Sequence, residues 1–315
     1  MLNKIENKKE RKIVGIDVGA SKIEWAVFEK GRIEEKRGRD TPGNLDNAGI
    51  AKIIAQIAEE NGAKKLGVAL PGYVKEGRII ELPNLPNIKN LDIEGRLKRK
   101  LKIPVFAEND VKCAALAEWK ERGGKRSDGF VMVAPGTGIG GAIVVNGKLV
   151  RGKENCAGEF GHMKMVFSQI RGKANAVEWE KICGGKGIEN TFNRIIRGRG
   201  SLRSSMYNEE SAKQILNSQN ALAKRVSREA AYYFGIGIGN IANALNPGEF
   251  VVSGGVGKAY CGKYRKWMMD GFKESAIAPV RNMKISKSKI ENPALAGAVL
   301  ITGRRNDEEI GEFLG

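Results

Sequence analysis

The sequence predicts an α/β protein with two domains. At 315 residues the chain is long enough to form two hydrophobic cores. Short apolar runs typical of buried strands alternate along it with stretches whose apolar residues recur at helical spacing. Two pairs of expected strands are joined by glycine-containing turns, at residues 17–22 and 135–141. This alternation favours sheets with helices packed on them.

The net charge and the spacing of the cysteines indicate which partners and which compartment are compatible with the sequence. Lys and Arg number 54 against 36 Asp and Glu, a net charge of +18, but the basic residues are spread along the whole chain. Spread charge is typical of a solvated surface, so we expect no nucleic-acid partner, although a polyanionic substrate is compatible with it. No apolar run approaches the roughly 20 residues of a membrane span, and the N-terminus lacks an apolar signal core. Four scattered cysteines indicate a reducing compartment, so we expect a cytoplasmic protein without a membrane partner.

The first two expected strands cover residues 12–18 and 23–28. The turn between them follows Asp17 and contains Gly19 and Ser21. The Gly19 amide and the Ser21 hydroxyl can donate hydrogen bonds to phosphate oxygens, and a single carboxylate such as Asp17 suits a hydrated Mg²⁺ ion. In a lone hairpin Asp17 would be an ordinary turn residue, so this interpretation depends on the second glycine-rich turn downstream.

A helix and another buried strand follow. Apolar residues recur at helical spacing over residues 44–61, and the pattern stops at Gly62. Residues 66–70 form an expected strand that runs into Pro71-Gly72, and an Asn-rich loop at 84–87 follows a polar hairpin. On spacing alone, both loops are ordinary connections.

A carboxylate stands at the end of the next expected strand. Residues 104–107 are apolar and lead into Glu108-Asn109-Asp110, and a helical pattern covers residues 111–120. Ligands of α/β proteins bind at the carboxyl ends of strands, where such a carboxylate can act as a catalytic base. Asp is also a common helix N-cap, so two roles stay open for Asp110.

The glycine-rich turn that follows matches a dinucleotide motif only in its spacing. Gly136, Gly138 and Gly141 satisfy G-x-G-x-x-G, which in a dinucleotide-binding domain opens a helix. Here residues 142–145 are Ala-Ile-Val-Val, so we expect a hairpin formed by strands over 130–134 and 142–145. A backbone with few side chains lets an anionic or polyol ligand come close to its N–H groups.

The rest of the chain supplies one more motif and several elements. Residues 157–162, Ala-Gly-Glu-Phe-Gly-His, contain the only histidine. Residues 250–253 predict a buried strand that leads into Gly254-Gly255. Helices are expected over residues 209–217, 220–245, 264–278 and 293–302, and a further strand over 283–288.

Taken in order, these motifs resemble those of the ROK family. The resemblance rests on Glu-Asn-Asp before an Ala-rich helix, on Gly-Thr-Gly-Ile-Gly-Gly from Gly136, and on Ala-Gly-Glu-x-Gly-His at 157–162. It extends from Ile13 to about Thr302. The combination is far more specific than any of its parts.

The resemblance implies a fold and a reaction. The fold is the two-domain actin-like ATPase fold (ribonuclease H-like) with an interdomain cleft. Its small domain would comprise residues 1–110, completed by a C-terminal helix at about 291–315, and its large domain residues 111–290. The reaction is the ATP-dependent phosphorylation of a hexose, most simply of glucose to glucose 6-phosphate by a glucokinase that uses Mg²⁺.

The family also implies which residues bind the ligands. Asp110 would take the proton of the acceptor hydroxyl as general base. The residues expected to bind the sugar are Pro71, Gly72, Asn84, Asn109, Glu159, His162 and Glu180. The residues expected to bind ATP are Asp17, Gly19, Ser21, Lys22, Gly136, Thr137, Gly138, Gly254 and Gly255, with Mg²⁺ held by Asp17 through water.

The chain departs from the family after His162. Many members carry three cysteines that bind structural zinc together with the His of Gly-x-Gly-His. Here residues 163–177 contain no cysteine, and Glu178 stands where the last one would be. His162 with one misplaced cysteine cannot build a tetrahedral site of four ligands, so we expect no zinc.

Three alternatives stay open. The acceptor can be another hexose or an N-acetylhexosamine, and the donor can be polyphosphate, although the expected adenosine-side loop at Gly254-Gly255 favours ATP. ROK members also include sugar-sensing repressors, which carry a helix-turn-helix domain ahead of the first phosphate strand, whereas 12 residues precede Ile13 here. The family further implies a homodimer.

Overall fold

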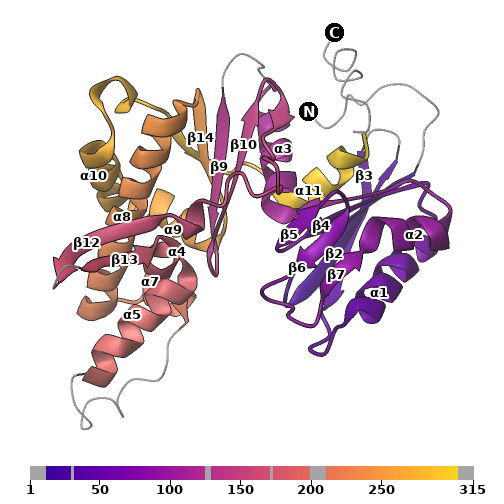
Figure 1. The fold of residues 1–315 in the computed structure, drawn as a ribbon, viewed down its shortest axis with the longest axis horizontal. Helices are drawn as coiled ribbons and strands as arrows, with labels where there is room; N and C mark the ends of the chain where they lie inside the picture. Colours follow the sequence, from indigo (N-terminus) through magenta and orange to yellow (C-terminus); the bar gives the residue numbers. More distant parts are fainter. Residues whose placement is uncertain (1–11, 30–31, 125–128, 171–172, 199–210, 304–315) are drawn as a thin grey trace. The chain divides into compact units, whose positions relative to one another are not determined.

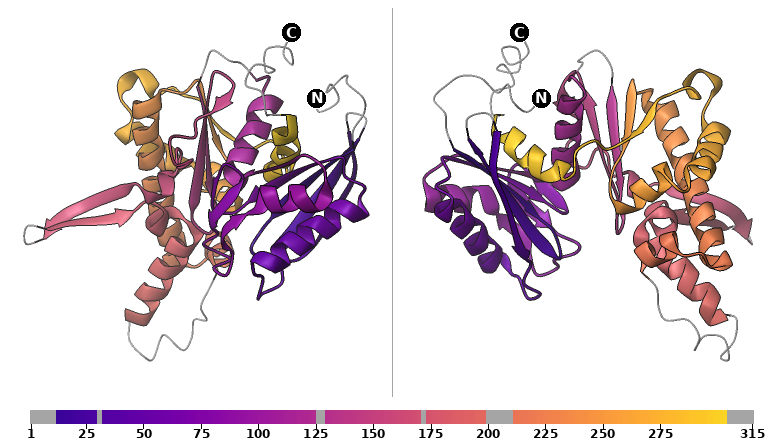
Figure 2. Two further views of the ribbon diagram at one scale, coloured as in Figure 1. Left: turned by 45° about the vertical axis from the view of Figure 1, so that its right-hand side comes forward. Right: turned by 180° about the vertical axis from the view of Figure 1, so that it is seen from behind.

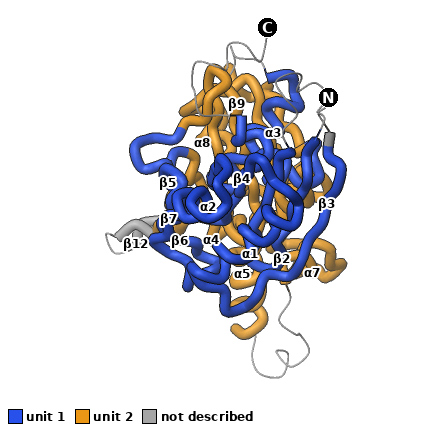
Figure 3. The backbone as a smooth tube through the Cα atoms, turned by 90° about the vertical axis from the view of Figure 1, so that its right-hand side faces the viewer, with its two compact units in different colours: residues 1–125, 151–157, 289–315 blue, residues 126–150, 158–288 orange. Residues whose placement is uncertain are grey.

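The computed structural model describes residues 12–29, 32–124, 129–170, 173–198 and 211–303. The chain forms two compact units (Figure 3). Unit 1 comprises Met1–Lys125, Arg151–Ala157 and Lys289–Gly315, and unit 2 comprises Arg126–Val150 and Gly158–Ser288. Relative to the expected boundary at residue 110, unit 1 also contains the next helix and the segment 151–157, because both pack on its other elements.

The main sheet of unit 1 has the strand order β3-β2-β1-β4-β8. The first three strands, β1 (Ile13–Val18), β2 (Lys22–Glu29) and β3 (Arg32–Asp40), form an antiparallel meander. Strands β4 (Lys65–Leu70) and β8 (Val105–Asn109) continue the sheet in parallel with β1. The parallel register pairs Asp17 with Ala69, and Leu70 with Asn109. The carboxyl ends of three parallel strands therefore lie at one edge of the sheet, where Asp17, Gly72, Asn109 and Asp110 are found.

Helices cover both faces of this sheet (Figure 1). On one face lie α1 (Asn47–Glu60) and α2 (Ile93–Leu101), and on the other lies α11 (Pro293–Leu300), which ends in a 3-10 turn, η3 (Ile301–Gly303). A Cβ atom at Gly67 of β4 would lie 1.7 Å from the carbonyl oxygen of Ala298, so glycine at that position lets α11 pack directly on the strand. Helix α3 (Asp110–Glu121) packs against α11.

Two features of unit 1 differ from the sequence prediction. Helix α2 was not predicted, because its sequence IEGRLKRKL has only Ile93 and Leu97 as buried apolar anchors among basic residues. A small antiparallel sheet forms from β5 (Tyr73–Lys75), β6 (Arg78–Glu81) and β7 (Lys89–Asp92), of which only the first hairpin was expected.

Unit 2 is built on a second mixed sheet with the order β11-β10-β9-β14-β15. Strands β9 (Phe130–Pro135) and β10 (Ile139–Val145) form the antiparallel hairpin predicted around the glycine-rich turn, and β11 (Lys148–Leu149) pairs with β10. Strands β14 (Glu249–Val252) and β15 (Ile285–Lys287) run parallel to β9.

The helices of unit 2 enclose an aromatic core. The long helix α8 (Ala221–Leu245) packs against α10 (Arg265–Ser275), and α9 (Gly255–Cys261) follows β14 directly. The Trp179 and Phe234 rings stack with centroids 5.1 Å apart, and Tyr260 lies 4.8 Å from Phe234. The same unit contains η1 (Phe160–His162), α4 (Glu180–Cys183), α5 (Gly185–Gly198), α7 (Ala212–Asn217) and η2 (Ala278–Val280).

A two-stranded hairpin occupies the stretch that lacks the family's cysteines. Among the strands that the structure describes, β12 (Lys164–Ile170) and β13 (Lys173–Glu178) pair with each other alone. Their hairpin, drawn in pink, extends away from the sheet of unit 2 (Figure 2). This hairpin was not predicted from the sequence, because its residues show little apolar alternation. The expected helix start at 209–210 lies outside the described residues. Among the helices that are described, none is long and apolar enough to cross a membrane.

Candidate functional site

Asp17 lies near the carboxyl end of β1 with a partly buried side chain. The pKa of its carboxyl group is raised from 3.8 to about 6. Burial is the largest cause, a hydrogen bond from Asn292 opposes it, and the nearby Glu24 adds to it. The Asn292 amide also donates to Glu24 at 3.0 Å. A carboxylate with this pKa is mostly charged at neutral pH. A single carboxylate beside the turn of a hairpin suits a Mg²⁺ ion that keeps most of its water ligands.

The turn after Asp17 is held by one of its own backbone hydrogen bonds and by Thr41. The Gly19 amide donates to the Lys22 carbonyl at 2.8 Å, and the Thr41 hydroxyl donates to the Gly19 carbonyl at 2.8 Å. The Gly19 amide is therefore not the phosphate donor that the sequence suggested. Ser21 and Lys22 are exposed at the tip, where the Lys22 ammonium pairs with Glu24 at 3.1 Å. Of the two donors suggested from the sequence, the Ser21 hydroxyl is the one that lies at the surface.

Asn109 and Gly72 meet at the carboxyl ends of β8 and β4. The Asn109 side-chain amide donates to the Gly72 carbonyl at 3.0 Å, and its oxygen accepts from the Lys112 amide at 3.0 Å. Asn109 is thus the N-cap of α3, and the alternative in which Asp110 caps this helix is wrong. The reason is positional: Asp110 is the first helical residue, and its Oδ1 accepts from the adjacent Val111 amide at 2.8 Å.

Two other sugar-binding candidates of unit 1 lie in loops. Pro71 follows β4 directly, next to Gly72. Asn84 is exposed in the loop between β6 and β7, which is shaped by two turns that end at Leu85 and Ile88. The buried side chains of Leu85 and Ile88 anchor this loop on the core of unit 1, so Asn84 is presented on a fixed backbone.

The glycine-rich turn of unit 2 packs on the start of α5. The Gly136 and Thr137 carbonyls accept from the Gly185 and Lys186 amides at 2.8 and 2.9 Å, and the Gly136 amide donates to Gly138 at 3.0 Å. Thr137 is exposed at the tip of the turn. The turn is therefore a rigid, exposed loop of backbone with almost no side chains.

Glu180 connects this turn with the histidine motif. Its Oε2 accepts from the Ile139 amide at 3.2 Å. A Cβ atom at Gly138 would lie 2.4 Å from that oxygen, and one at Gly161 would lie 3.1 Å from it. Small residues on both sides thus make room for the carboxylate. Glu159 precedes η1 and is half-buried, and His162 at the end of η1 is exposed.

His162, Glu178 and Glu180 bring possible metal-ligand atoms within 4.8 Å of one another. However, both oxygens of Glu178 are occupied: Lys164 and Lys181 each donate to one of them at 2.7 Å. The hydrogen bonds from Lys164 and then Lys181 lower the pKa of Glu178 to about 2. A cation at this position would compete with two ammonium groups, and this group of ligands contains no thiolate. The residues therefore do not fit a cysteine-rich zinc site, and neither Cys156 nor Cys183 belongs to the group.

The second glycine-rich loop of unit 2 lies beside the first. Gly254 follows β14 with φ +75°, and a Cβ atom there would lie 2.5 Å from the Pro135 carbonyl oxygen at the end of β9. Because β9 and β14 are parallel neighbours, the turns after them emerge at the same edge of the sheet. A Cβ atom at Gly255 or at Gly136 would meet no atom within 4 Å, so both open onto free space.

The structure therefore brings the predicted residues together in two sets. In unit 1, the strand-end set contains Asp17, Gly72, Asn109 and Asp110. In unit 2, one set joins the glycine-rich loops to Glu180 and His162. Asn292, the partner of Asp17, was not predicted, because its only local signal is that of an N-cap one residue before Pro293.

Comparisons with known proteins match most of the chain. The family model described as the ROK family matches residues 13–304. The glucokinase of Halalkalibacterium halodurans is 30% identical over 276 residues, which cover 79% of this chain and 82% of that protein. The N-acetyl-D-glucosamine kinase of Histophilus somni is 32% identical over 257 residues, which cover 77% and 83%. A glucokinase from Streptomyces griseus, solved in complex with glucose and AMPPNP, shares the fold with a TM-score of 0.71 at 23% identity, over 92% of this chain and 98% of that chain.

Proposed function

The chain belongs to the ROK family and has its actin-like ATPase fold, and from this premise we propose that it is an ATP-dependent sugar kinase. The acceptor is a hexose, most simply glucose, which becomes glucose 6-phosphate. The observation that carries the proposal is Asp110, which lies at the carboxyl end of β8 in the first turn of α3, beside the Asn109–Gly72 pair. A carboxylate in that position is a suitable base for a sugar hydroxyl.

In this reaction the sugar hydroxyl oxygen attacks the γ-phosphorus, the bond from phosphorus to the β,γ-bridging oxygen breaks, and ADP leaves. Asp110 accepts the hydroxyl proton as the new bond forms. The Val111 amide holds Oδ1 of Asp110 at 2.8 Å and thereby orients the carboxyl group. Little further chemistry is required of the protein, because phosphoryl transfer depends chiefly on positioning and on stabilising charge.

Sugar recognition would use the side chains near Asp110 together with Glu159, His162 and Glu180. A carboxylate can accept hydrogen bonds from two sugar hydroxyls and so distinguishes one epimer from another. The Ile139 amide and two glycines hold the Glu180 carboxylate in a defined place, which supports such a role.

The nucleotide would bind at the two glycine-rich loops and at the Asp17 hairpin. The exposed backbone at Gly136 and Gly255 supports ATP as donor, since polyphosphate has no adenosine to place beside such a loop. Asp17 would hold Mg²⁺ through water, and the ion would supply neutralising charge to the phosphates. The Mg²⁺ requirement, the cytoplasmic location and the homodimer stay predictions.

The decisive test of this proposal is Asp110→Asn. Asparagine keeps the oxygen that accepts from Val111, so the helix start should be retained, but turnover should fall by about 10²–10⁴. Sugar affinity, measured by calorimetry, should change little. Asp92→Asn is a matched control, because Asp92 also accepts from the first turn of a helix, the Gly95 amide at 2.9 Å. Turnover of Asp110→Asn within a few-fold of wild type would refute the role of base.

The acceptor and the donor need a separate measurement. The similarity to an N-acetyl-D-glucosamine kinase favours that amino sugar as a second candidate acceptor. A coupled assay should compare kcat/KM for glucose, mannose, fructose and N-acetylhexosamines, each with ATP and with long-chain polyphosphate at two salt concentrations. A polyphosphate advantage that falls steeply with salt would show that the net charge of +18 serves the donor.

A further inference from the structure

Residues Arg151–Ala157 connect two parts of unit 2 but pack on unit 1. We call them the connecting segment. The chain leaves unit 2 after Val150, contacts unit 1 through the connecting segment, and returns to unit 2 at Gly158. Glu159 and the η1 residues follow immediately. The connecting segment therefore leads directly into this motif.

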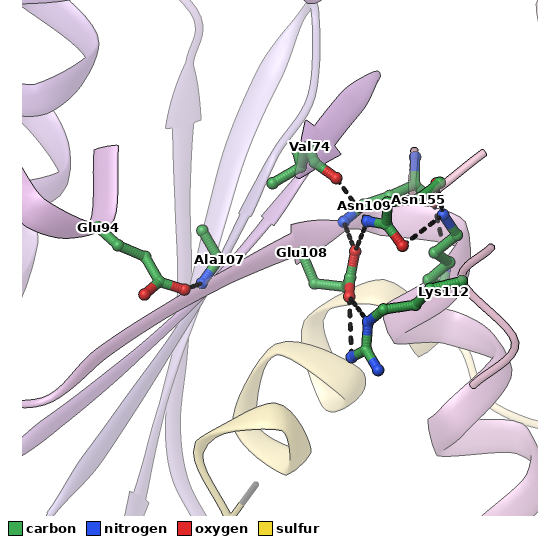
Figure 4. Close-up of polar contacts among 8 residues, drawn as sticks. Val74, Glu94, Ala107, Glu108, Asn109, Lys112 and Asn155 are labelled. Atoms are coloured by element: carbon green, nitrogen blue, oxygen red, sulfur yellow. Dashed lines mark hydrogen bonds and ion pairs between the residues drawn. The ribbon is translucent and has the colours of Figure 1, made fainter. Parts of the chain in front are cut away.

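A buried carboxylate holds the first part of the connecting segment (Figure 4). Glu108, only 5% exposed, accepts from the Arg151 guanidinium through Nε and a terminal nitrogen, each at 3.1 Å. Its other oxygen accepts from the Asn109 amide at 3.0 Å and from the Asn155 side chain at 2.9 Å. Glu108 thus joins the connecting segment to the residue that precedes Asp110. Hydrogen bonds to a charged group are stronger than neutral ones.

Asn155 holds the second part. Its backbone is left-handed, with φ +57°, a conformation that asparagine tolerates better than most residues. Its side-chain nitrogen donates to Glu108 and to the Val74 carbonyl of β5, and its side-chain oxygen accepts from the Lys112 ammonium at 3.1 Å. Its carbonyl oxygen is also bonded to Lys112.

Lys112 lies in the first turn of α3 and is 1% exposed. A buried ammonium group is costly unless it is hydrogen-bonded. Two of its hydrogen bonds go to Asn155, three residues before the return to unit 2 at Gly158. Stability alone does not require such a group here, since a buried apolar side chain of similar length would pack without a desolvation cost.

We propose that Glu108, Lys112 and Asn155 are positioning residues for sugar binding: they fix the connecting segment to the strand end that bears Asn109 and Asp110. The connecting segment continues directly into the Gly158–His162 stretch, which contains two of the residues proposed to bind the sugar. This inference rests on the proposed function. It assigns these residues no contact with substrate, so their loss should weaken the binding of sugar more than it slows the chemical step.

Glu94 supplies a matched control. It is 6% exposed, lines the same cavity of about 360 Å³ as Glu108 and Arg151, and accepts from the Ala107 amide at 2.9 Å, one residue before Glu108 (Figure 4). Its second oxygen pairs with Lys98 at 2.7 Å. Glu94 therefore has the same chemistry and burial as Glu108 in the same part of unit 1, but Ala107 and Lys98, which it binds, lie outside the connecting segment.

The experiment compares Glu108→Gln, Asn155→Gly and Glu94→Gln in the full-length enzyme. Glycine at 155 keeps the left-handed backbone and removes only the side-chain hydrogen bonds, so this variant should fold even if Glu108→Gln does not. For the first two variants we expect the sugar KM to rise about tenfold, because a tenfold change corresponds to the net free energy of roughly one hydrogen bond. We expect their kcat to stay within about threefold of wild type. For Glu94→Gln we expect a similar loss of thermal stability and a sugar KM within about twofold of wild type.

Two outcomes overturn the inference. One is a folded Asn155→Gly variant with an unchanged sugar KM, and the other is an equal rise of KM in Glu94→Gln. A wild-type protein that phosphorylates no sugar would overturn the proposed function and, with it, this inference. A wild-type protein that does phosphorylate sugar, together with either outcome above, would overturn this inference alone.

Trypsin provides a readout that does not depend on activity. Arg151 and Lys153 are exposed cleavage points within the connecting segment. If the contacts of Asn155 hold this segment, cleavage after Lys153 should be about tenfold faster in Asn155→Gly than in wild type or Glu94→Gln. Equal cleavage rates in the three proteins would show that the contacts do not hold it.

Discussion

Replacing Asp17 by Asn should stabilise the protein at neutral pH while weakening its use of ATP. The pKa of Asp17 is raised from 3.8 to about 6, chiefly by burial. A rise of about two pKa units means that the charged form costs roughly 3 kcal/mol of folding free energy at most. Asparagine has nearly the same shape and carries no charge, so it removes this cost.

The direction with pH follows from the raised pKa. Folding favours the protonated form of Asp17, so its contribution to stability is fully present below the ordinary pKa of 3.8 and is lost as pH rises through about 6. Between pH 4.5 and 7.5 the loss for wild type should be about 2 kcal/mol. Asp17→Asn lacks this loss. Its free energy of unfolding should therefore exceed that of wild type by about 2 kcal/mol more at pH 7.5 than at pH 4.5.

Urea unfolding of both proteins at these two pH values measures the effect. Asp40→Asn is the control, because Asp40 is an exposed carboxylate at the end of β3 in the same sheet. In parallel, the KM for Mg-ATP of wild type should rise as pH falls below about 6, because Asp17 becomes protonated, and that of Asp17→Asn should be high throughout. A stability difference that is the same at both pH values would refute the argument that Asp17 is ionised at a cost in the folded protein.

Three further results are expected. Gly254→Ala should destabilise unit 2 by about 1–3 kcal/mol in thermal unfolding, because φ is +75° and the added Cβ atom would lie 2.5 Å from the Pro135 oxygen. Gly255→Ala should be nearly neutral, because its Cβ atom would lie within 4 Å of no other atom. Glu180→Gln should raise the sugar KM about tenfold without changing the KM for ATP, and equal effects on both would refute its assignment to the sugar. Metal analysis of purified protein should find less than one zinc per chain, and stoichiometric zinc that a chelator removes with loss of structure would contradict this.

The sequence was sufficient for the elements whose signal is local. Both glycine-containing hairpins, the long helix before Asn246 and the strand before Gly254 form where periodicity and turn residues predicted them. The strand–loop–strand reading of Gly136–Gly141 is confirmed, because β-branched residues after the turn favour a strand over a helix. The alternative in which Asp110 caps the helix is wrong, since Ncap and N1 are adjacent positions that composition alone does not separate.

Tertiary structure decided what depends on partners distant in the chain. Nothing near Glu108 in the sequence indicates that it binds a segment 43 residues away, and nothing near Glu24 indicates a partner 268 residues away. Likewise, the pKa of Asp17 depends on burial and on Asn292, which lies far along the chain, and the ion pair of Glu178 with Lys164 forms only when β12 and β13 come together. Local patterns determine backbone conformation because it is set by neighbouring residues, whereas charge, hydrogen bonding and burial at a site are set by residues that only folding brings into contact.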